Sequence, residues 1–125
     1  MSIGCALCHT PTLKTGTATV AALRNQNANL YSDLLVHDMG VGLADGVSQG
    51  QANGREFRTA PLWGLGQRLF FLHDGRSTDL LDAIAQHQSG SSSQGTASEA
   101  NGVIGNFNGL TDRQQQDILN FLRSL

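Results

Sequence analysis

Two cysteines and a histidine stand together near the start of the sequence, in the segment Cys5-Ala6-Leu7-Cys8-His9. The chain has no other cysteine. Two thiols at this spacing on a helical turn can each add to one of the two vinyl groups of a porphyrin, and the next residue then points its imidazole at the iron. The spacing predicts one covalent c-type haem, attached through Cys5 and Cys8, with His9 as the proximal iron ligand.

Three other uses of these side chains compete with haem. A disulfide between Cys5 and Cys8 would close a very short loop, which contributes little stability and leaves His9 without a role. A thioredoxin-like redox pair follows a strand, and the sequence opens with no strand. A structural zinc ion usually takes a second closely spaced ligand pair, and none is present. Haem is therefore favoured over all three.

The ligand on the opposite side of the iron has several candidates. Besides His9 the chain has His37, His73 and His87, and besides the initiator it has one methionine, Met39. His87 is favoured, because we expect it on the apolar face of a helix, where an imidazole without a partner is costly. Met39, in the segment HDMG, comes next and His73, in FLHDGR, follows. An open sixth position would instead permit peroxide or oxygen chemistry.

Two helices are predicted to position these groups. In residues 78–88 the apolar side chains and His87 recur at helical spacing, with Thr78 or Asp79 as the N-cap. Residues 111–125 open with a capping-box pattern and carry one apolar stripe, so this helix closes the domain.

The rest of the chain reads mostly as loops. Residues 17–24 could begin a short helix, whereas residues 40–54 form a Gly-rich stretch without a sustained period. Residues 89–102 are rich in Ser and Gly, and we expect this loop to be the most mobile part of the molecule.

Bulk properties narrow the function classes. The 125 residues suit one domain, 1–125, with a modest core. Fifteen glycines and a charged fraction of 14 % leave few strong helix formers, as expected where a large prosthetic group supplies part of the core. A net charge of −2 disfavours nucleic acid as a partner. Apolar runs stay far below the roughly 18 residues of a membrane span.

Several segments together resemble a known family. FRTAPLWGLG (57–66), FLHDGRSTDLLDAI (71–84), YSDLLVHDMG and GCALCHTPTL are similar to the C-terminal c-type haem domain of the bacterial di-haem cytochrome c peroxidase superfamily. The nearest branch is the di-haem family often labelled thiol oxidoreductases. The resemblance implies a mainly α, cytochrome c-like fold with long Gly/Ser-rich loops. It also implies a distal ligand at His87, hence a bis-histidine haem, and a place for Arg58 near the haem propionates.

The sequence departs from that family in carrying one C-x-x-C-H motif where the relatives have two. We therefore expect an electron-transfer domain more than a catalyst by itself, with a redox protein or an upstream haem domain as partner. Peroxidase or oxidase activity at an open sixth site is the alternative, as is the electron-entry half of a larger di-haem enzyme. Covalent haem attachment predicts a bacterial periplasm, and Cys5 leaves no room for a secretory signal in this chain.

Overall fold

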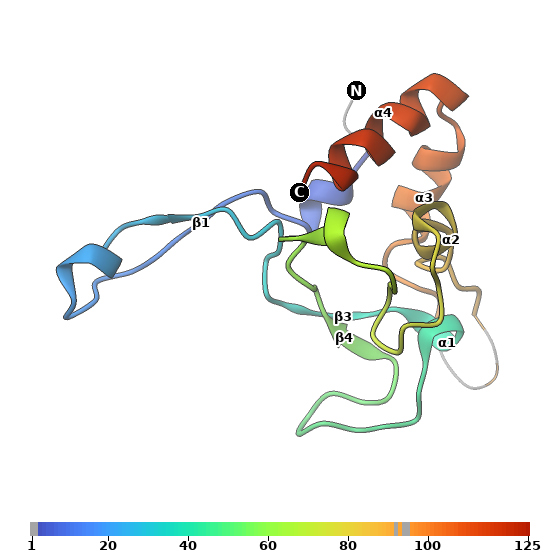
Figure 1. The fold of residues 1–125 in the computed structure, drawn as a ribbon. Helices are drawn as coiled ribbons and strands as arrows, with labels where there is room; N and C mark the ends of the chain where they lie inside the picture. The colour runs from blue at the N-terminus through green and yellow to red at the C-terminus, as the bar shows by residue number, and fades with distance from the viewer. Residues whose placement is uncertain (1–2, 92, 94–95) are drawn as a thin grey trace.

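The short strands all lie between residues 13 and 58, and the longer helices follow from residue 80 to residue 123 (Figure 1). The computed structural model describes residues 3–91, 93 and 96–125. Helix makes up 32 % and strand 12 %, so the expectation of a mainly α fold is wrong, and the molecule is a small mixed α/β domain. The physical reason lies in the composition, because fifteen glycines and frequent Asn and Ser favour turns and short paired segments over long helices.

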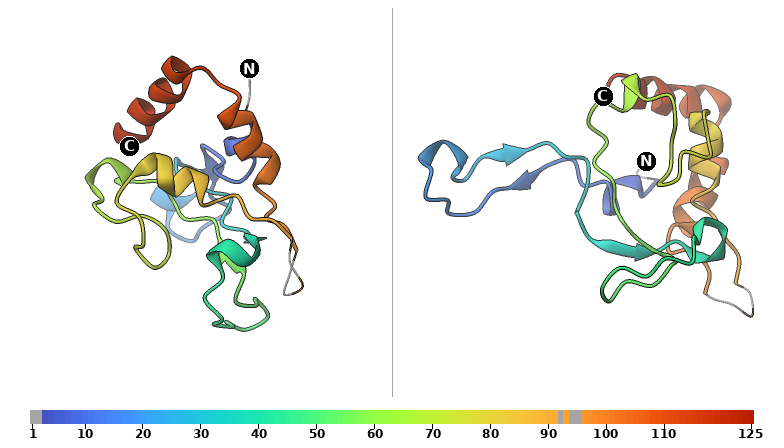
Figure 2. Two further views of the ribbon diagram at one scale, coloured as in Figure 1. Left: turned by 90° about the vertical axis from the view of Figure 1, so that its right-hand side faces the viewer. Right: turned by 60° about the horizontal axis from the view of Figure 1, so that its bottom comes forward.

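A two-stranded arm follows the cysteine segment. Strand β1 (Leu13–Lys14) pairs antiparallel with β2 (Asn27–Ala28), and the arm projects from the rest of the chain (Figures 1 and 2). The helix expected at residues 17–24 is reduced to the single 3-10 turn η2 (Ala21–Leu23) at its tip. Val20 is the N-cap residue of this turn, and its side chain makes no capping hydrogen bond. The turn therefore lacks a cap that would favour a longer helix.

A second small sheet carries the HDMG segment. Strand β3 (Val36–Asp38) pairs antiparallel with β4 (Glu56–Arg58), with His37 opposite Phe57. The short helix α1 (Gly40–Leu43) follows β3 directly, so the stretch predicted as a loop at residues 40–54 begins as one helical turn.

Three further helices and a 3-10 turn complete the domain. Helix α2 (Leu80–Ala85) is capped by Asp79, one of the two predicted caps, and α4 (Asp112–Arg123) has the predicted capping box. Helix α3 (Asn101–Asn108) was not expected from the sequence and begins within the Ser/Gly-rich stretch. The core joins α2, α4 and η3 (Leu65–Gln67) through Leu65, Leu80 and Leu119.

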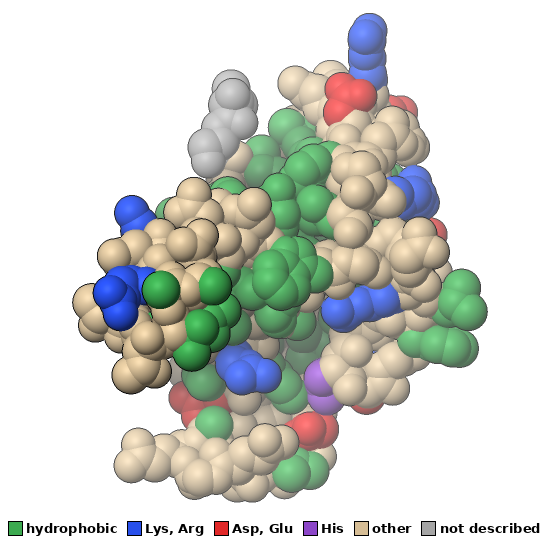
Figure 3. All heavy atoms as spheres, turned by 60° about the vertical axis from the view of Figure 1, so that its left-hand side comes forward, with side chains coloured by type: hydrophobic (Ala, Val, Ile, Leu, Met, Phe, Trp, Pro, Cys, Tyr) green, Lys and Arg blue, Asp and Glu red, His purple; other side chains and the backbone are tan. Residues whose placement is uncertain are grey.

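That core is small, and much apolar surface remains outside it. The accessible surface is 8000 Å², whereas a compact chain of 13.3 kDa should expose about 6,500 Å². Figure 3 shows hydrophobic side chains gathered in the middle of one face. The large side chains that are more than two-fifths exposed include Leu7, Leu34, Leu35, Val36, Trp63, Leu69 and Phe70. The protein alone therefore leaves uncovered apolar surface that a bulky apolar group could cover.

The segment after α2 is held at its base. Ser89 and Ser98 are both buried, and the Ser98 backbone N–H donates to the Ser89 carbonyl at 3.0 Å. Residues 92, 94 and 95 of the loop expected to be mobile lie outside the described residues, and its mobility stays a prediction. Among the described helices, none is long and apolar enough to cross a membrane.

Candidate functional site

The cysteine segment forms the 3-10 turn η1 (Cys5–Leu7) with His9 directly after it. Gly4 begins the turn at φ 108°, a conformation that favours glycine, and the His9 N–H donates to the Cys5 carbonyl at 2.9 Å. Both cysteines are free thiols, so the disulfide alternative is not formed. Partial burial, with the charges of Asp33 and Glu99, raises the pKa of the Cys8 thiol. A redox-active cysteine pair needs the opposite shift.

His9 is fixed by a backbone carbonyl. Its Nδ1 lies 3.0 Å from the Tyr31 carbonyl oxygen, and since a carbonyl only accepts, Nδ1 carries the proton and Nε2 is left with a free lone pair. Burial lowers the pKa of His9, which keeps the imidazole neutral. A neutral imidazole with one nitrogen tied to a carbonyl is the usual state of a metal-ligating histidine.

The turn at residues 31–34 places that carbonyl. Tyr31 and Leu34 adopt left-handed φ values of 51° and 61°, which cost energy for residues with a side chain. Fully buried Ser32 holds the turn, because its hydroxyl donates to the Thr59 carbonyl at 2.7 Å and accepts from the Leu34 N–H at 2.9 Å. The Asp33 N–H donates to the Cys8 carbonyl at 2.8 Å, so this turn is bound directly to the cysteine segment.

The expectation that His87 lies on the apolar face of a helix over residues 78–88 is wrong, because α2 ends at Ala85 and His87 lies in the turn after it. Its ring nonetheless has an arrangement that matches that of His9. Its Nδ1 donates to the Ala83 carbonyl at 2.7 Å, one turn earlier, which also satisfies a carbonyl at the end of the helix. Its Nε2 has no hydrogen-bond partner among the described residues. His9 and His87 thus share one arrangement, in which Nδ1 donates to a backbone carbonyl and Nε2 has no partner among the described residues.

His37 is in a different state. Its Nε2 lies 2.9 Å from an Asp33 carboxylate oxygen and its Nδ1 lies 2.9 Å from a Glu99 carboxylate oxygen. Burial would lower the pKa of His37, but these two hydrogen bonds outweigh it and raise the pKa. His37 is therefore an imidazolium that donates through both nitrogens and has no lone pair for a metal.

The same region contains a group of potential metal ligands. Ligand atoms of Cys8, Asp33 and His37 lie within 4.8 Å of one another, and the Cys8 Sγ is 3.9 Å from the His37 Nδ1. A zinc ion there would have to remove the His37 proton and break one of its two carboxylate bonds. That cost makes a zinc site less favourable than the haem arrangement.

The remaining predicted residues have other surroundings. Met39 is the N-cap residue of α1. The His73 ring stacks on Phe57, with centroids 4.3 Å apart, and its Nε2 is 3.7 Å from an Asp45 carboxylate oxygen. Arg58 is exposed in β4 opposite Val36. No hydrogen bond or ion pair of the Arg58 side chain is seen among the described residues.

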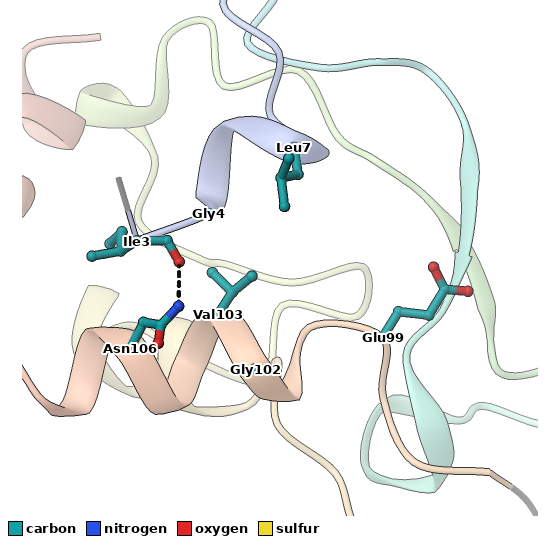
Figure 4. Close-up of a pocket in the computed structure, with 7 residues that line it drawn as sticks. All are labelled: Ile3, Gly4, Leu7, Glu99, Gly102, Val103 and Asn106. Atoms are coloured by element: carbon teal, nitrogen blue, oxygen red, sulfur yellow. Dashed lines mark hydrogen bonds between the residues drawn. The ribbon is translucent and has the colours of Figure 1, made fainter. Parts of the chain in front are cut away.

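An open depression of about 490 Å³ lies between η1 and α3. Leu7 points into it from η1, while Val103 and Asn106 line it from α3 (Figure 4). The Asn106 side-chain amide donates to the Ile3 carbonyl at 3.1 Å. These contacts fasten the cysteine segment to α3.

The residues present fit a c-type haem. Two free thiols stand at the C-x-x-C-H sequence spacing of haem attachment, and two histidines each offer an Nε2 without a partner among the described residues. Uncovered apolar side chains provide surface that a porphyrin could bury. The sequence pattern pointed to these side chains, but it gave no signal for the carbonyls of Tyr31 and Ala83. The pairing of His37 with Asp33 and Glu99 was also missed, although Asp33 lies four residues before His37.

Comparison with known proteins agrees with this chemistry. The family model described as "Di-haem oxidoreductase, putative peroxidase" matches residues 1–125. Neither the curated proteins nor the solved structures that were compared contain a match to the chain.

Proposed function

Because the chain belongs to the di-haem oxidoreductase family, whose name implies a haem cofactor and redox chemistry, we propose that it transfers electrons through one covalent c-type haem. Cys5 and Cys8 form the two thioether bonds, and His9 and His87 are the axial ligands. The bound haem supplies the one-electron chemistry, and the protein sets its potential through the axial ligands, burial and hydrogen bonds.

One observation carries this proposal. His9 and His87 each donate Nδ1–H to a backbone carbonyl, of Tyr31 and Ala83 respectively, and each keeps Nε2 free. Both imidazoles are half-buried, and the lack of an Nε2 partner among the described residues distinguishes them from His37, which has a carboxylate partner on each nitrogen. Two histidines with this shared arrangement, one of them directly after two free thiols, support the assignment of both as ligands of one iron.

Each protein group has a defined task in this account. The two thioethers prevent loss of the haem, and the Tyr31 carbonyl raises the basicity of His9 by accepting its Nδ1 proton. The Ala83 carbonyl does the same for His87. Exposed Arg58 is proposed to lie near the propionates, where its charge would favour the carboxylates.

The chain is proposed to form a single haem domain, corresponding to the C-terminal domain of its di-haem relatives. The family description names two haems and the sequence has one C-x-x-C-H motif. The second haem then belongs to an upstream domain or to a redox partner. Covalent haem attachment favours the bacterial periplasm as the compartment.

Peroxide chemistry at an open sixth site is the competing function, and the family description names it. It requires an unliganded face of the iron and a free acid–base group beside it. His37 donates through both nitrogens and His73 stacks on Phe57, so neither is available for that task without rearrangement. Electron transfer is therefore the better supported of the two functions.

The test is to produce the chain together with the haem-attachment machinery. We expect a pyridine haemochrome of the c type that survives acid acetone, and a ferrous protein that binds carbon monoxide slowly or not at all. A colourless protein would refute the haem assignment. Rapid carbon monoxide binding would refute bis-histidine ligation and favour the peroxidase alternative.

A further inference from the structure

We propose that His37 is a positioning residue that ties the segment carrying His9 to the segment carrying His87, and so holds the distal ligand on the iron. The inference rests on the proposed function, since it concerns the two proposed ligands. It assigns a role to the HDMG segment, which the haem site itself does not use.

On the proximal side the connection runs through Asp33. Its backbone N–H donates to the Cys8 carbonyl, next to His9, and its carboxylate accepts from the His37 Nε2 at 2.9 Å. The Asp33 side chain is 12 % exposed and that of His37 is 18 % exposed, so solvent screens this pair only in part. His37 is thereby fixed relative to the turn that carries the proximal ligand.

On the distal side the connection runs through Glu99. Its carboxylate accepts from the His37 Nδ1 at 2.9 Å. The neighbouring residue, buried Ser98, donates its hydroxyl to the His87 carbonyl at 2.6 Å. A movement of Glu99 would therefore also move Ser98, which is hydrogen-bonded to the backbone of His87.

The base of the segment after His87 is a closed hydrogen-bonded ring. Asn101 accepts from the Ser89 N–H and donates to the Ser89 carbonyl, both at 2.9 Å. Ser98 donates its N–H to the same carbonyl at 3.0 Å. His87, Ser89, Ser98 and Glu99 thus belong to one firmly connected unit.

Strand β3 clamps this unit a second time. The Asp38 N–H donates to the Glu99 carboxylate at 3.0 Å, and the Glu99 N–H donates to the Asp38 carbonyl at 2.9 Å. The Thr96 hydroxyl donates to the Asp38 carboxylate at 2.7 Å. The His37–Asp38 pair therefore bridges the two ligand-bearing segments through both its side chains and its backbone.

An imidazolium suits this position for a specific reason. Asp33 and Glu99 are both anionic, and the hydrogen bonds from His37 contribute to the lowered pKa of each. Without His37 the two carboxylates would lose their shared donor, and of the bridge only the contacts of Asp38 would still hold the distal segment. The Glu99 side chain is 55 % exposed, so solvent screens its pair with His37, and most of the effect comes from the less exposed Asp33 pair. We expect loss of the bridge to shift the equilibrium between bound and released distal ligand by about tenfold, which corresponds to about 1.4 kcal/mol.

The test uses the haem-loaded protein with His37→Ala and, as a milder change, Glu99→Gln. The rate of carbon monoxide binding to the ferrous protein reports how often the distal ligand leaves the iron. We expect His37→Ala to raise this rate about tenfold and to add a high-spin fraction to the ferric spectrum. Glu99→Gln should act in the same direction with a smaller effect, and His37→Gln, which keeps a donor, should restore part of the loss.

Two control variants separate positioning from general destabilisation. Thr111→Ala removes the capping box of α4 and lowers stability without touching the bridge. Gln86→Ala removes a hydrogen bond to Asp82 beside His87 that connects no second segment. Neither should change the carbon monoxide rate by more than about twofold.

The outcomes are distinguishable from failure of the proposed function. If wild-type protein carries no covalent haem, or binds carbon monoxide rapidly, the proposed function itself fails. If wild-type protein binds carbon monoxide slowly and both His37→Ala and Glu99→Gln bind it equally slowly, the positioning role is overturned. Should His37→Ala fail to load haem, Glu99→Gln decides alone, and an unchanged rate in that variant overturns the role.

Discussion

Gly40 is the position where the structure makes the sharpest quantitative prediction. It has φ 69°, and a Cβ added there would lie 2.9 Å from the Ser98 backbone nitrogen and from the Ser89 side chain. Gly40→Ala therefore combines two costs. A left-handed conformation costs a residue with a side chain roughly 1–2 kcal/mol, and relief of the overlap costs about 1–3 kcal/mol. We expect a total loss of about 2–5 kcal/mol in unfolding free energy.

Two neighbouring glycines separate these costs. Gly46 has φ 73°, but no atom lies within 4 Å of the place that a Cβ would occupy, so Gly46→Ala should show the conformational cost alone, about 1–2 kcal/mol. Gly42 lacks a positive φ and its Cβ would lie 3.3 Å from Ser89, so Gly42→Ala should stay within about 1 kcal/mol of wild type. Gly46→Ala thus measures the conformational cost, Gly42→Ala the cost of a close contact, and Gly40→Ala both costs together.

The assay is urea unfolding of the haem-loaded ferric protein, followed by the haem absorbance and by far-UV circular dichroism. Because Ser98 contacts the His87 carbonyl, Gly40→Ala should also raise the carbon monoxide rate, whereas Gly46→Ala should not. The reasoning is refuted if Gly40→Ala is no more destabilising than Gly46→Ala.

Three further predictions concern pH, the cofactor and the last helix. The pKa of His37 is raised in the folded protein, so its contribution to stability is complete below the pKa of an unfolded histidine and is lost as pH rises through the folded pKa. The pKa values of Asp33 and Glu99 are lowered, so their contribution to stability is lost as pH falls through the folded pKa of each carboxyl group. The difference in unfolding free energy between wild type and His37→Gln should therefore be largest between about pH 5 and pH 6 and smaller at lower and higher pH. A difference that does not change with pH in unfolding titrations would contradict this prediction. The Cys5→Ala, Cys8→Ala double variant should be poorly folded, because haem supplies part of the core; a thermal transition as cooperative and as high as that of the holoprotein would contradict this. Thr111→Ala should cost about 1 kcal/mol through loss of the α4 cap, and no change in the urea midpoint would show that the cap does not contribute.

The parts of the fold that were predictable depend on local signals. The capping box at Thr111 is confirmed, and of the two candidates Thr78 and Asp79 the structure selects Asp79. These signals are local, since a capping side chain acts within three residues of its own position. The family was also recognised, because several specific segments combine in one chain. The helix predicted from local periodicity at residues 17–24 is not formed, and one 3-10 turn lies there at the tip of a strand pair.

The parts that could not be predicted depend on contacts between distant residues. The two small sheets pair short segments across long loops, and nothing within β3 or β4 alone indicates the partner. Helix α3 lies in a Gly- and Asn-rich stretch of low helix propensity and owes its place to buried Ile104 and Phe107. In the candidate site, residue types indicated His9 and His87, whereas the backbone carbonyls that orient them carry no sequence signature.

His9 and His87 are proposed to hold one covalent haem between them. The most direct measurement compares the ferric spin state and the midpoint potential of haem-loaded wild type, Met39→Leu and His87→Met. We expect Met39→Leu to match the low-spin wild type. His87→Met should raise the potential or leave a high-spin iron, because a thioether replaces an imidazole or fails to reach. A changed spin state in Met39→Leu together with an unchanged one in His87→Met would contradict the account.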